Sequence, residues 1–144
     1  MGWNKDHLIP ENEISEKVTD ATIMFAKDFG FYLAESVKDP VKNRVIEEAL
    51  TTNQLRKFFG EVKRQQLSGY DQTAFAMLKP KLAYAAGRAH KDKKKYKIDD
   101  FYFVLSDAID KVNRSADKNK AFKNFISVFE AIVAYHKAAE NKVK

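Results

Sequence analysis

The sequence contains no cysteine, and this absence removes several classes of protein at once. Disulfide scaffolds and thiolate metal sites are both excluded, and a chain without cysteine suits a reducing compartment inside the cell. The first residues lack the apolar run of a secretory signal. Apolar stretches elsewhere span only a few residues, far short of a membrane helix. We therefore expect a cytoplasmic protein that does not enter a membrane.

The motifs that usually mark catalysis are missing as well. There is no His-Glu-x-x-His metal pattern, no glycine-rich phosphate loop and no nucleophile elbow. The three histidines fall in different segments: His7, His90 and His136. His136 lies near an apolar stripe, where we expect a packed, hydrogen-bonded side chain. We expect no enzyme, metal or cofactor, although a small helical enzyme assembled from distant residues stays open as an alternative.

What the chain does contain is a balanced globular composition with a basic surplus. Its 144 residues are 44% apolar and 32% charged, which is typical of one soluble globular domain spanning residues 1–144. Lysine and arginine outnumber aspartate and glutamate by 26 to 20, which gives a net charge of +6. This surplus favours an anionic partner such as nucleic acid, but many ordinary soluble proteins are equally basic.

Helical periodicity begins near the N-terminus. Residues 1–12 show no periodicity, and we expect them to be loosely held. From Ile14 onward, apolar residues recur at three and four positions, which predicts a helix through Leu33 with a possible break at Gly30. Asp39 followed by Pro40 is a helix-start signal, and it predicts a short helix through Leu50.

Start and stop signals divide the middle of the chain into two helices. Thr51 and Gln54 have the spacing of a capping box, and Ser68-Gly69 is a stop signal for the helix that follows. Asp71 can cap the next helix. Pro80 lies inside that helix and should kink it or mark a boundary, because proline removes a backbone donor.

The C-terminal third predicts two further helices. A lysine-rich connector over residues 90–97 shows no periodicity, and we interpret it as a solvated charge run that could also touch a nucleic-acid backbone. Asp99 and Asp117 are expected to cap the helices that follow. No alternating strand or hairpin signal is found, and adjacent acidic residues such as Glu47 and Glu48 should diverge around a helix. The sequence predicts an all-α protein, a compact bundle of five to six helices.

The predicted helix from Thr52 carries cations away from its apolar stripe. Arg56 and Lys63 are seven positions apart and share one flank, while Lys57 and Arg64 share the outward side. Groups at this spacing lie about 10 Å apart, within reach of successive phosphates. A solvated helix face, with Glu61 pairing with its neighbours, is the alternative.

A second set of candidate contacts lies on the next helix. Lys81, Tyr84 and Arg88 share the side opposite the apolar stripe, so two cations bracket one ring. This arrangement is typical of single-strand binding, in which charge holds phosphates and a ring stacks on a base. Tyr84 could instead pack against a neighbouring helix, and Gly87 could allow a close approach of ligand or helix.

Three motifs in order resemble the small, inner-filament subunit of type III-A CRISPR (Csm) effector complexes. They are Leu-Thr-Thr-x-x-Leu-Arg at residues 50–56, Leu-Lys-x-Lys…Tyr-x-Ala-Gly-Arg at 78–88, and Phe-Glu-Ala-apolar-Val-Ala-Tyr at 129–135. The resemblance covers roughly residues 45–138, and the first 40 residues show no motif. Pro80 departs from the pattern, which leaves the direction of its neighbouring lysines open.

The resemblance implies a helical protein that stacks in several copies along guide and target RNA, beside other subunits of the Csm complex, without catalysis of its own. It implies RNA contact at Arg56, Lys79, Lys81 and Arg88. Our prediction from the residues adds Lys57, Lys63, Arg64 and Tyr84. The hypothesis is therefore a non-catalytic RNA-binding scaffold that associates with itself into a filament. The alternative is a protein–protein interaction module without direct RNA binding.

Overall fold

The computed structural model describes residues 2–141, and most of them lie in helices. Five helices span twelve or more residues: α2 Asp20–Ala34, α3 Thr52–Ser68, α5 Leu78–Ala89, α6 Ile98–Asn113 and α7 Lys118–Glu140. Two helices are only five residues long: α1 Glu11–Ser15 and α4 Gln72–Ala76. Three short strands complete the fold: β1 Val37–Lys38, β2 Val45–Glu48 and β3 Lys95–Tyr96. The predicted helical class is confirmed.

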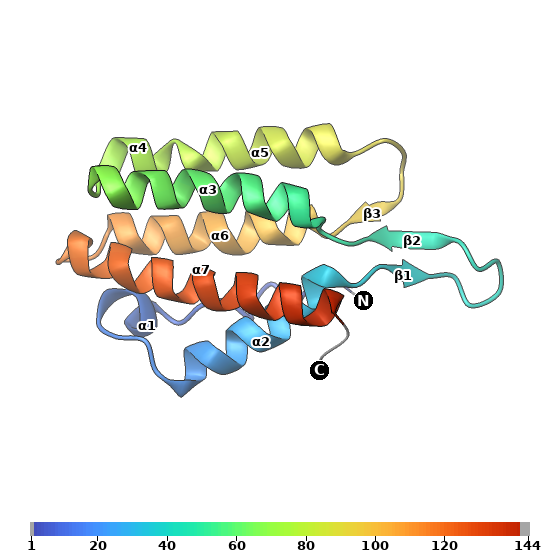
Figure 1. The fold of residues 1–144 in the computed structure, drawn as a ribbon, viewed down its shortest axis with the longest axis horizontal. Coiled ribbons are helices and arrows are strands. Elements are labelled where there is room, and N and C mark those ends of the chain that lie inside the picture. The colour runs from blue at the N-terminus through green and yellow to red at the C-terminus, as the bar shows by residue number, and fades with distance from the viewer. Residues whose placement is uncertain (1, 142–144) are drawn as a thin grey trace.

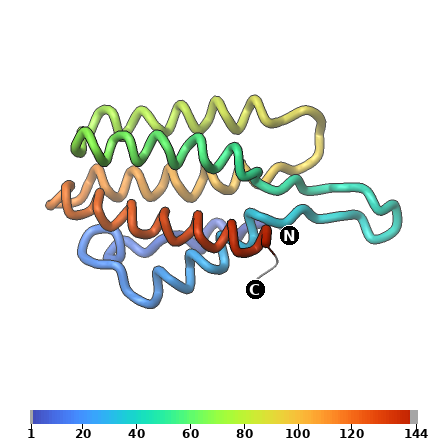
Figure 2. Tube along the Cα trace, viewed as in Figure 1, coloured from blue at the N-terminus to red at the C-terminus, as the bar shows by residue number. Residues whose placement is uncertain are grey.

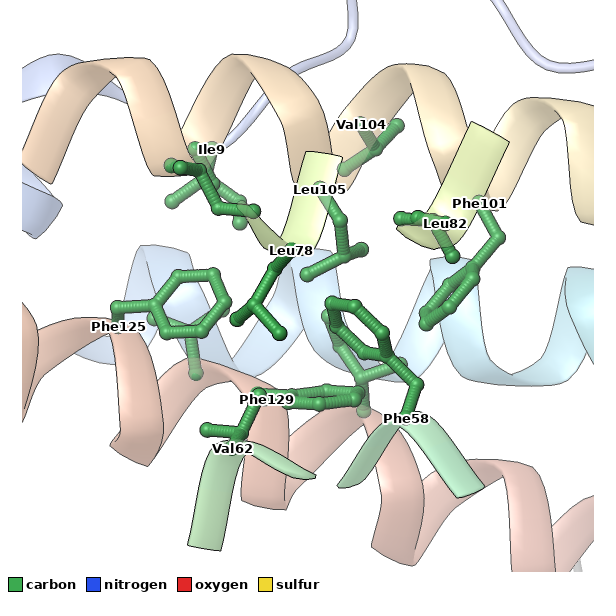
Figure 3. Close-up of a cluster of buried hydrophobic side chains, with 14 of the residues drawn as sticks. Ile9, Phe58, Val62, Leu78, Leu82, Phe101, Val104, Leu105, Phe125 and Phe129 are labelled. Carbon is green, nitrogen blue, oxygen red and sulfur yellow. The ribbon is translucent and has the colours of Figure 1, made fainter. Parts of the chain in front are cut away.

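The helices pack in layers around one apolar core. In Figure 1, α3, α4 and α5 lie on one side, α6 and α7 in the middle, and α1 and α2 on the other side. α7 packs against both α2 and α6, and α6 also packs against α5. Aromatic side chains from three helices, α3, α6 and α7, meet in the core, as Figure 3 shows for Phe58, Phe101 and Phe129. Leu78 and Leu82 join this core from α5, which lies beside α3 on the same side of the molecule.

Several predicted boundaries are confirmed by side-chain caps. Thr51 and Gln54 form the capping box of α3, and Gly69 ends that helix with a φ of 96°. The carboxylates of Asp71 and Asp117 accept hydrogen bonds from the backbone N–H groups of Ala74 and Lys120. A left-handed φ favours glycine, which explains the stop signal after Ser68.

Pro80 marks a helix boundary, as predicted. α4 ends at Ala76, and α5 begins at Leu78, which makes Pro80 the third residue of α5. The first four backbone N–H groups of a helix have no partner within it, so proline costs little there.

The helix predicted after Asp39 is wrong, because residues 37–48 form a β-hairpin. The Asp39 carboxylate does accept hydrogen bonds from the N–H groups of Val41 and Lys42, as an N-cap would. The chain then turns back instead of coiling, with Asn43 at a φ of 54°. The β-branched Val45 and its neighbours pair antiparallel with β1. Glu47 and Glu48 therefore lie on a strand and not around a helix.

The lysine-rich connector contributes the third strand, which the sequence also did not predict. β3 pairs parallel with β2, placing Lys95 beside Glu47 and Tyr96 beside Glu48. Figure 2 shows the hairpin extending past the end of the helices, with the connector running back beside it. Asp99 does not cap α6: the N-cap position belongs to Lys97, and Asp99 lies in the first turn.

The N-terminal helix breaks earlier than predicted. α1 ends at Ser15, and α2 starts after Thr19. The buried Glu13 carboxylate accepts hydrogen bonds from the N–H groups of Thr19 and Thr22, at 2.8 and 3.2 Å. Burial alone would raise the Glu13 pKa, but these bonds and the threonine hydroxyls outweigh it and lower the pKa. Gly30 is not a break: it lies buried within α2.

Three further expectations concern residues 1–12, His136 and membrane spans. The mobility of residues 1–12 stays a prediction, although Ile9 in that segment is buried and its carbonyl accepts a 2.7 Å hydrogen bond from Lys111 Nζ. His136 is a packed core residue, as expected, with Nε2 lying 2.8 Å from the Leu50 carbonyl oxygen. No helix in residues 2–141 combines the length and the hydropathy that a bilayer span requires.

Candidate nucleic-acid interface

A groove of about 510 Å³ runs between α3 and α5. Residues of α3 form one wall, residues of α5 form the other, and Ile98 and Phe101 of α6 lie at its base. Apolar side chains such as Leu78 and Leu82 form its inner part, and both are almost fully buried. Polar and charged groups are therefore confined to its rim.

Four of the eight predicted contact residues line this groove. Lys57 lies on the α3 wall, and Lys81, Tyr84 and Arg88 lie on the α5 wall. Tyr84 is 67% exposed, so the alternative in which its ring packs against a neighbouring helix is wrong. The Arg88 guanidinium lies over the Tyr84 ring, 5.7 Å from its centroid. The groove thus brings together three cations and one solvent-exposed ring.

Glu61 is the one carboxylate among the residues that line the groove. Its oxygen Oε1 lies 2.5 Å from an Arg64 nitrogen and 3.1 Å from Lys81 Nζ. The hydrogen bond from Arg64 and the contact with Lys81 outweigh the opposing effect of burial and lower the Glu61 pKa to about 2. Glu61 stays ionised and holds Lys81 across the groove, which ties α3 to α5.

The remaining predicted contacts lie elsewhere. Lys63 points toward α7 and pairs with Glu130 at 3.0 Å, while Lys79 pairs with Asp110 of α6 at 2.7 Å. Arg56 is exposed and shares the Lys63 flank of α3, and Arg64 is exposed beside Glu61. The eight residues therefore do not share one surface: four line the groove and four lie around it.

Small residues keep the outer side of α5 open. Ala85 and Gly87 are exposed, and a Cβ added at Gly87 would meet nothing within 4 Å among the described atoms. The interpretation that Gly87 serves helix packing within this chain is therefore wrong. Large side chains here would narrow the approach to Tyr84 and Arg88.

The hairpin carries cations that sequence reasoning missed. Lys38, Lys42 and Arg44 are exposed near its tip, and Val41 there is 88% exposed. No carboxylate lies within ion-pair distance of these three cations in the part of the chain that the structure describes. The helix predicted for this segment hid them, although Asp39-Pro40 and the β-branched pair after Arg44 could have indicated a turn between strands.

Titratable clusters are sparse across residues 2–141. No group of three or more histidine, aspartate or glutamate side chains within that range could hold a metal ion. His90 Nε2 lies 2.9 Å from both carboxylate oxygens of Asp99, a surface contact that joins the connector to α6. His90 belongs to the connector for which a nucleic-acid contact was considered, Asp99 does not, and the pair lies outside the groove.

Fold and groove together define a small, basic, mostly helical protein with a cation-rimmed surface groove. The family model Csm2 Type III-A matches residues 34–142, about three quarters of the chain. The chain therefore belongs to the Csm2 family and is a structural subunit of the type III-A CRISPR effector complex. No significant match is found among curated proteins or among solved structures.

The matched region contains every element of the groove. It includes the hairpin, α3 and α5, and it leaves out α1 and nearly all of α2. Two of the three motifs that carry the resemblance lie on the groove walls, one at the start of α3 and one along α5. The third lies on α7, where Phe129 and Ile132 are core residues.

Proposed function

We propose that this chain is a non-catalytic, RNA-binding scaffold subunit of its effector complex, and that the face around the α3–α5 groove holds the phosphate backbone of guide or target RNA. The observation that carries this proposal is the clustering of Lys57, Lys81 and Arg88 beside an exposed Tyr84. The proposal takes its RNA-guided and cytoplasmic setting from membership of a type III-A CRISPR family. Base pairing between guide and target would then provide sequence specificity.

The predicted RNA contacts differ in whether each cation already pairs with a carboxylate of the chain. No carboxylate lies within 4.0 Å of Lys57, Arg56 or Arg88 anywhere in residues 2–141, so these cations are available to phosphates. Lys63 and Lys79 would have to leave carboxylates at 3.0 and 2.7 Å. We therefore assign Lys57 and Arg88 the main contacts. Supporting contacts go to Arg56, which lies outside the groove, and to Lys81 and Arg64, which both pair with Glu61. Lys63 and Lys79 have the smallest share.

Such contacts position RNA without reading its sequence. Phosphate contacts fix register and orientation, whereas sequence is read at base edges. Each phosphate neutralised on a single strand contributes about 0.7 to the slope of log affinity against log salt concentration. This slope gives a direct count of contacts for any variant.

The test compares two double variants with equal charge change. Lys57→Gln/Arg88→Gln removes two groove cations, and Lys63→Gln/Lys79→Gln removes two paired cations on other flanks. Affinity for fluorescent single-stranded RNA is measured at several salt concentrations, with circular dichroism to check helicity. The groove variant should bind more weakly, with a salt slope flatter by about 1.4. The control should bind nearly as the unmodified protein does.

Two results would count against the proposal. Equal weakening by both variants would mean that only net charge matters, and no binding by the unmodified protein at physiological salt would favour the alternative interaction module. The control variant should stay folded, because exposed ion pairs contribute only about 0–1 kcal/mol each.

We also propose that copies associate head to tail, which builds an open filament when the contact surfaces differ. Exposed apolar residues lie at opposite ends of the molecule: Val41 at the hairpin tip and Leu67, 91% exposed, at the far end of α3. Native mass spectrometry of the RNA-bound assembly should show fewer copies for Leu67→Asp than for the unmodified chain. An unchanged copy number would mean that the Leu67 end of α3 does not take part in the contact between copies.

A further inference from the structure

We infer that the α3–α5 groove takes up the base of an unpaired RNA nucleotide, in addition to the phosphate contacts at its rim. This inference rests on the RNA-binding function proposed above, and it adds a ligand subsite to it. The groove volume, about 510 Å³, lies within the range of small-molecule sites and exceeds what one base needs.

The lining changes from apolar inside to charged outside. Leu50, Leu78, Leu82 and Phe101 are 2% exposed or less and line the interior. These side chains form the floor and are covered by their neighbours, so the surface that a ligand can reach is that of the exposed lining residues Tyr84, Ala85 and Arg88. A planar base is apolar on both faces and polar at its edges, so it can lay a face against Tyr84 and Ala85. Gln54, on the α3 wall, accepts the Thr51 N–H through Oε1 in the capping box, which leaves its amide NH₂ group to donate to a base edge.

Tyr84 supplies a stacking surface at the entrance. It is 67% exposed, so its ring is open to a ligand. Arg88 lies close to this ring, at 5.7 Å from its centroid, and its guanidinium can both stack on a base and bind a phosphate. One nucleotide would thus place its base on Tyr84 and its phosphate near Arg88 or Lys57.

The charge of the rim favours a nucleotide over a helix of a partner protein. Lys57, Lys81 and Arg88 face one carboxylate, Glu61, so the groove has an excess of positive charge. An amphipathic helix usually enters a groove with apolar anchors one and two turns apart. Here the rim carries one ring and three cations. A ligand that matches this rim has a negative charge directly beside a flat apolar group, as a nucleotide does.

The experiment compares an intact RNA strand with an abasic strand of equal length and phosphate count, using the full chain. Stacking of a base on an aromatic side chain changes affinity by roughly ten- to hundredfold. The unmodified protein should therefore bind the intact strand at least about tenfold more tightly than the abasic strand. A 2-aminopurine placed in the intact strand should lose fluorescence on binding.

Ala85→Leu narrows the groove without changing charge, and Ala134→Leu on the exposed side of α7 is the matched control. Ala85→Leu should abolish the preference for the intact strand and keep the salt slope, whereas Ala134→Leu should keep both. Tyr84→Leu should reduce the preference in the same way.

The outcomes separate the two proposals. If both strands bind equally with a normal salt slope, RNA binding stands and the base subsite is overturned. If neither strand binds, the proposed function fails and the subsite fails with it. If Ala85→Leu leaves RNA binding intact but weakens retention of another subunit of the complex, the groove holds protein and this inference is wrong.

Discussion

Replacement of Gly30 by alanine should destabilise the contact between α2 and α7. Gly30 lies in the middle of α2, where alanine would normally be the better helix former. A Cβ built at this position would lie 2.8 Å from the Tyr135 Cβ, 2.9 Å from the His136 nitrogen and 2.9 Å from the Ile132 oxygen. Two of these three atoms belong to the backbone of α7, so no rotamer change can relieve the overlap.

The expected magnitude follows from two opposing effects. Alanine gains about 1 kcal/mol of helix propensity over glycine. Overpacking a tight interior costs about 1–3 kcal/mol, and the backbone overlap at Gly30 places this site at the upper end. We expect a net loss of about 2 kcal/mol in the free energy of unfolding. For a chain of this size that lowers the Tm by about 6 °C.

Gly60→Ala is the matched control. Gly60 lies on the exposed side of α3, and a Cβ there would meet none of the described atoms within 4 Å. This variant should gain about 1 kcal/mol from propensity alone. Urea unfolding followed by circular dichroism measures both variants. The reasoning would be refuted by a Gly30→Ala protein as stable as the unmodified chain, because α2 and α7 would then not approach as closely as described.

Three further predictions concern buried and charged groups. Glu13→Gln should lower the free energy of unfolding by about 1–3 kcal/mol, measured in urea, because buried N–H groups such as that of Thr22 lose a charged acceptor. His136→Phe should cost a similar amount by leaving the Leu50 carbonyl without its donor, and a stable variant would contradict this. The Glu61 pKa is depressed to about 2, so its contribution is complete above pH 4.3 and is lost as the pH falls toward about 2. Because these ion pairs are partly exposed, acid titration of Glu61→Gln should differ from that of the unmodified chain by less than about 1 kcal/mol, while its RNA affinity at low salt should rise.

The helices of the C-terminal two thirds could be predicted because their signals are local. Thr51, Asp71 and Asp117 each bond to a backbone group three positions later, and such caps are visible in sequence spacing. The same local signal misled at Asp39, whose carboxylate bonds to the same kind of backbone group in a turn. The third strand has no local signal at all, because Glu47 pairs with Lys95, far along the chain.

The candidate site was predictable in its residue types but only partly in its geometry. Helical spacing placed Lys81, Tyr84 and Arg88 on one side of α5, and all three line the groove. The spacing could not show that Lys63 meets Glu130 or that Lys79 meets Asp110, because those partners come from other helices. The periodicity of one helix predicts which residues share a face of that helix. It does not predict their ion pairs, because the partners lie on neighbouring helices.

Gly30 illustrates the same limit for packing. A glycine within a helical pattern is compatible with a break, a kink or a close contact, and the sequence alone does not separate them. The atoms that decide the matter belong to Ile132, Tyr135 and His136, a hundred or more positions away. The real break lies before Thr19, the N-cap of α2, where the Glu13 carboxylate accepts hydrogen bonds from the N–H groups of Thr19 and Thr22.

The central claim is that the α3–α5 face touches RNA in the assembled complex, and photo-crosslinking tests it most directly. Target and guide strands carrying 4-thiouridine are irradiated in the complete effector complex, and the crosslinked peptides of this subunit are identified by mass spectrometry. We predict crosslinks within residues 52–68 and 78–89, with Tyr84 among the modified residues. Crosslinks confined to α2, α7 or the hairpin, with none on α3 or α5, would contradict the account.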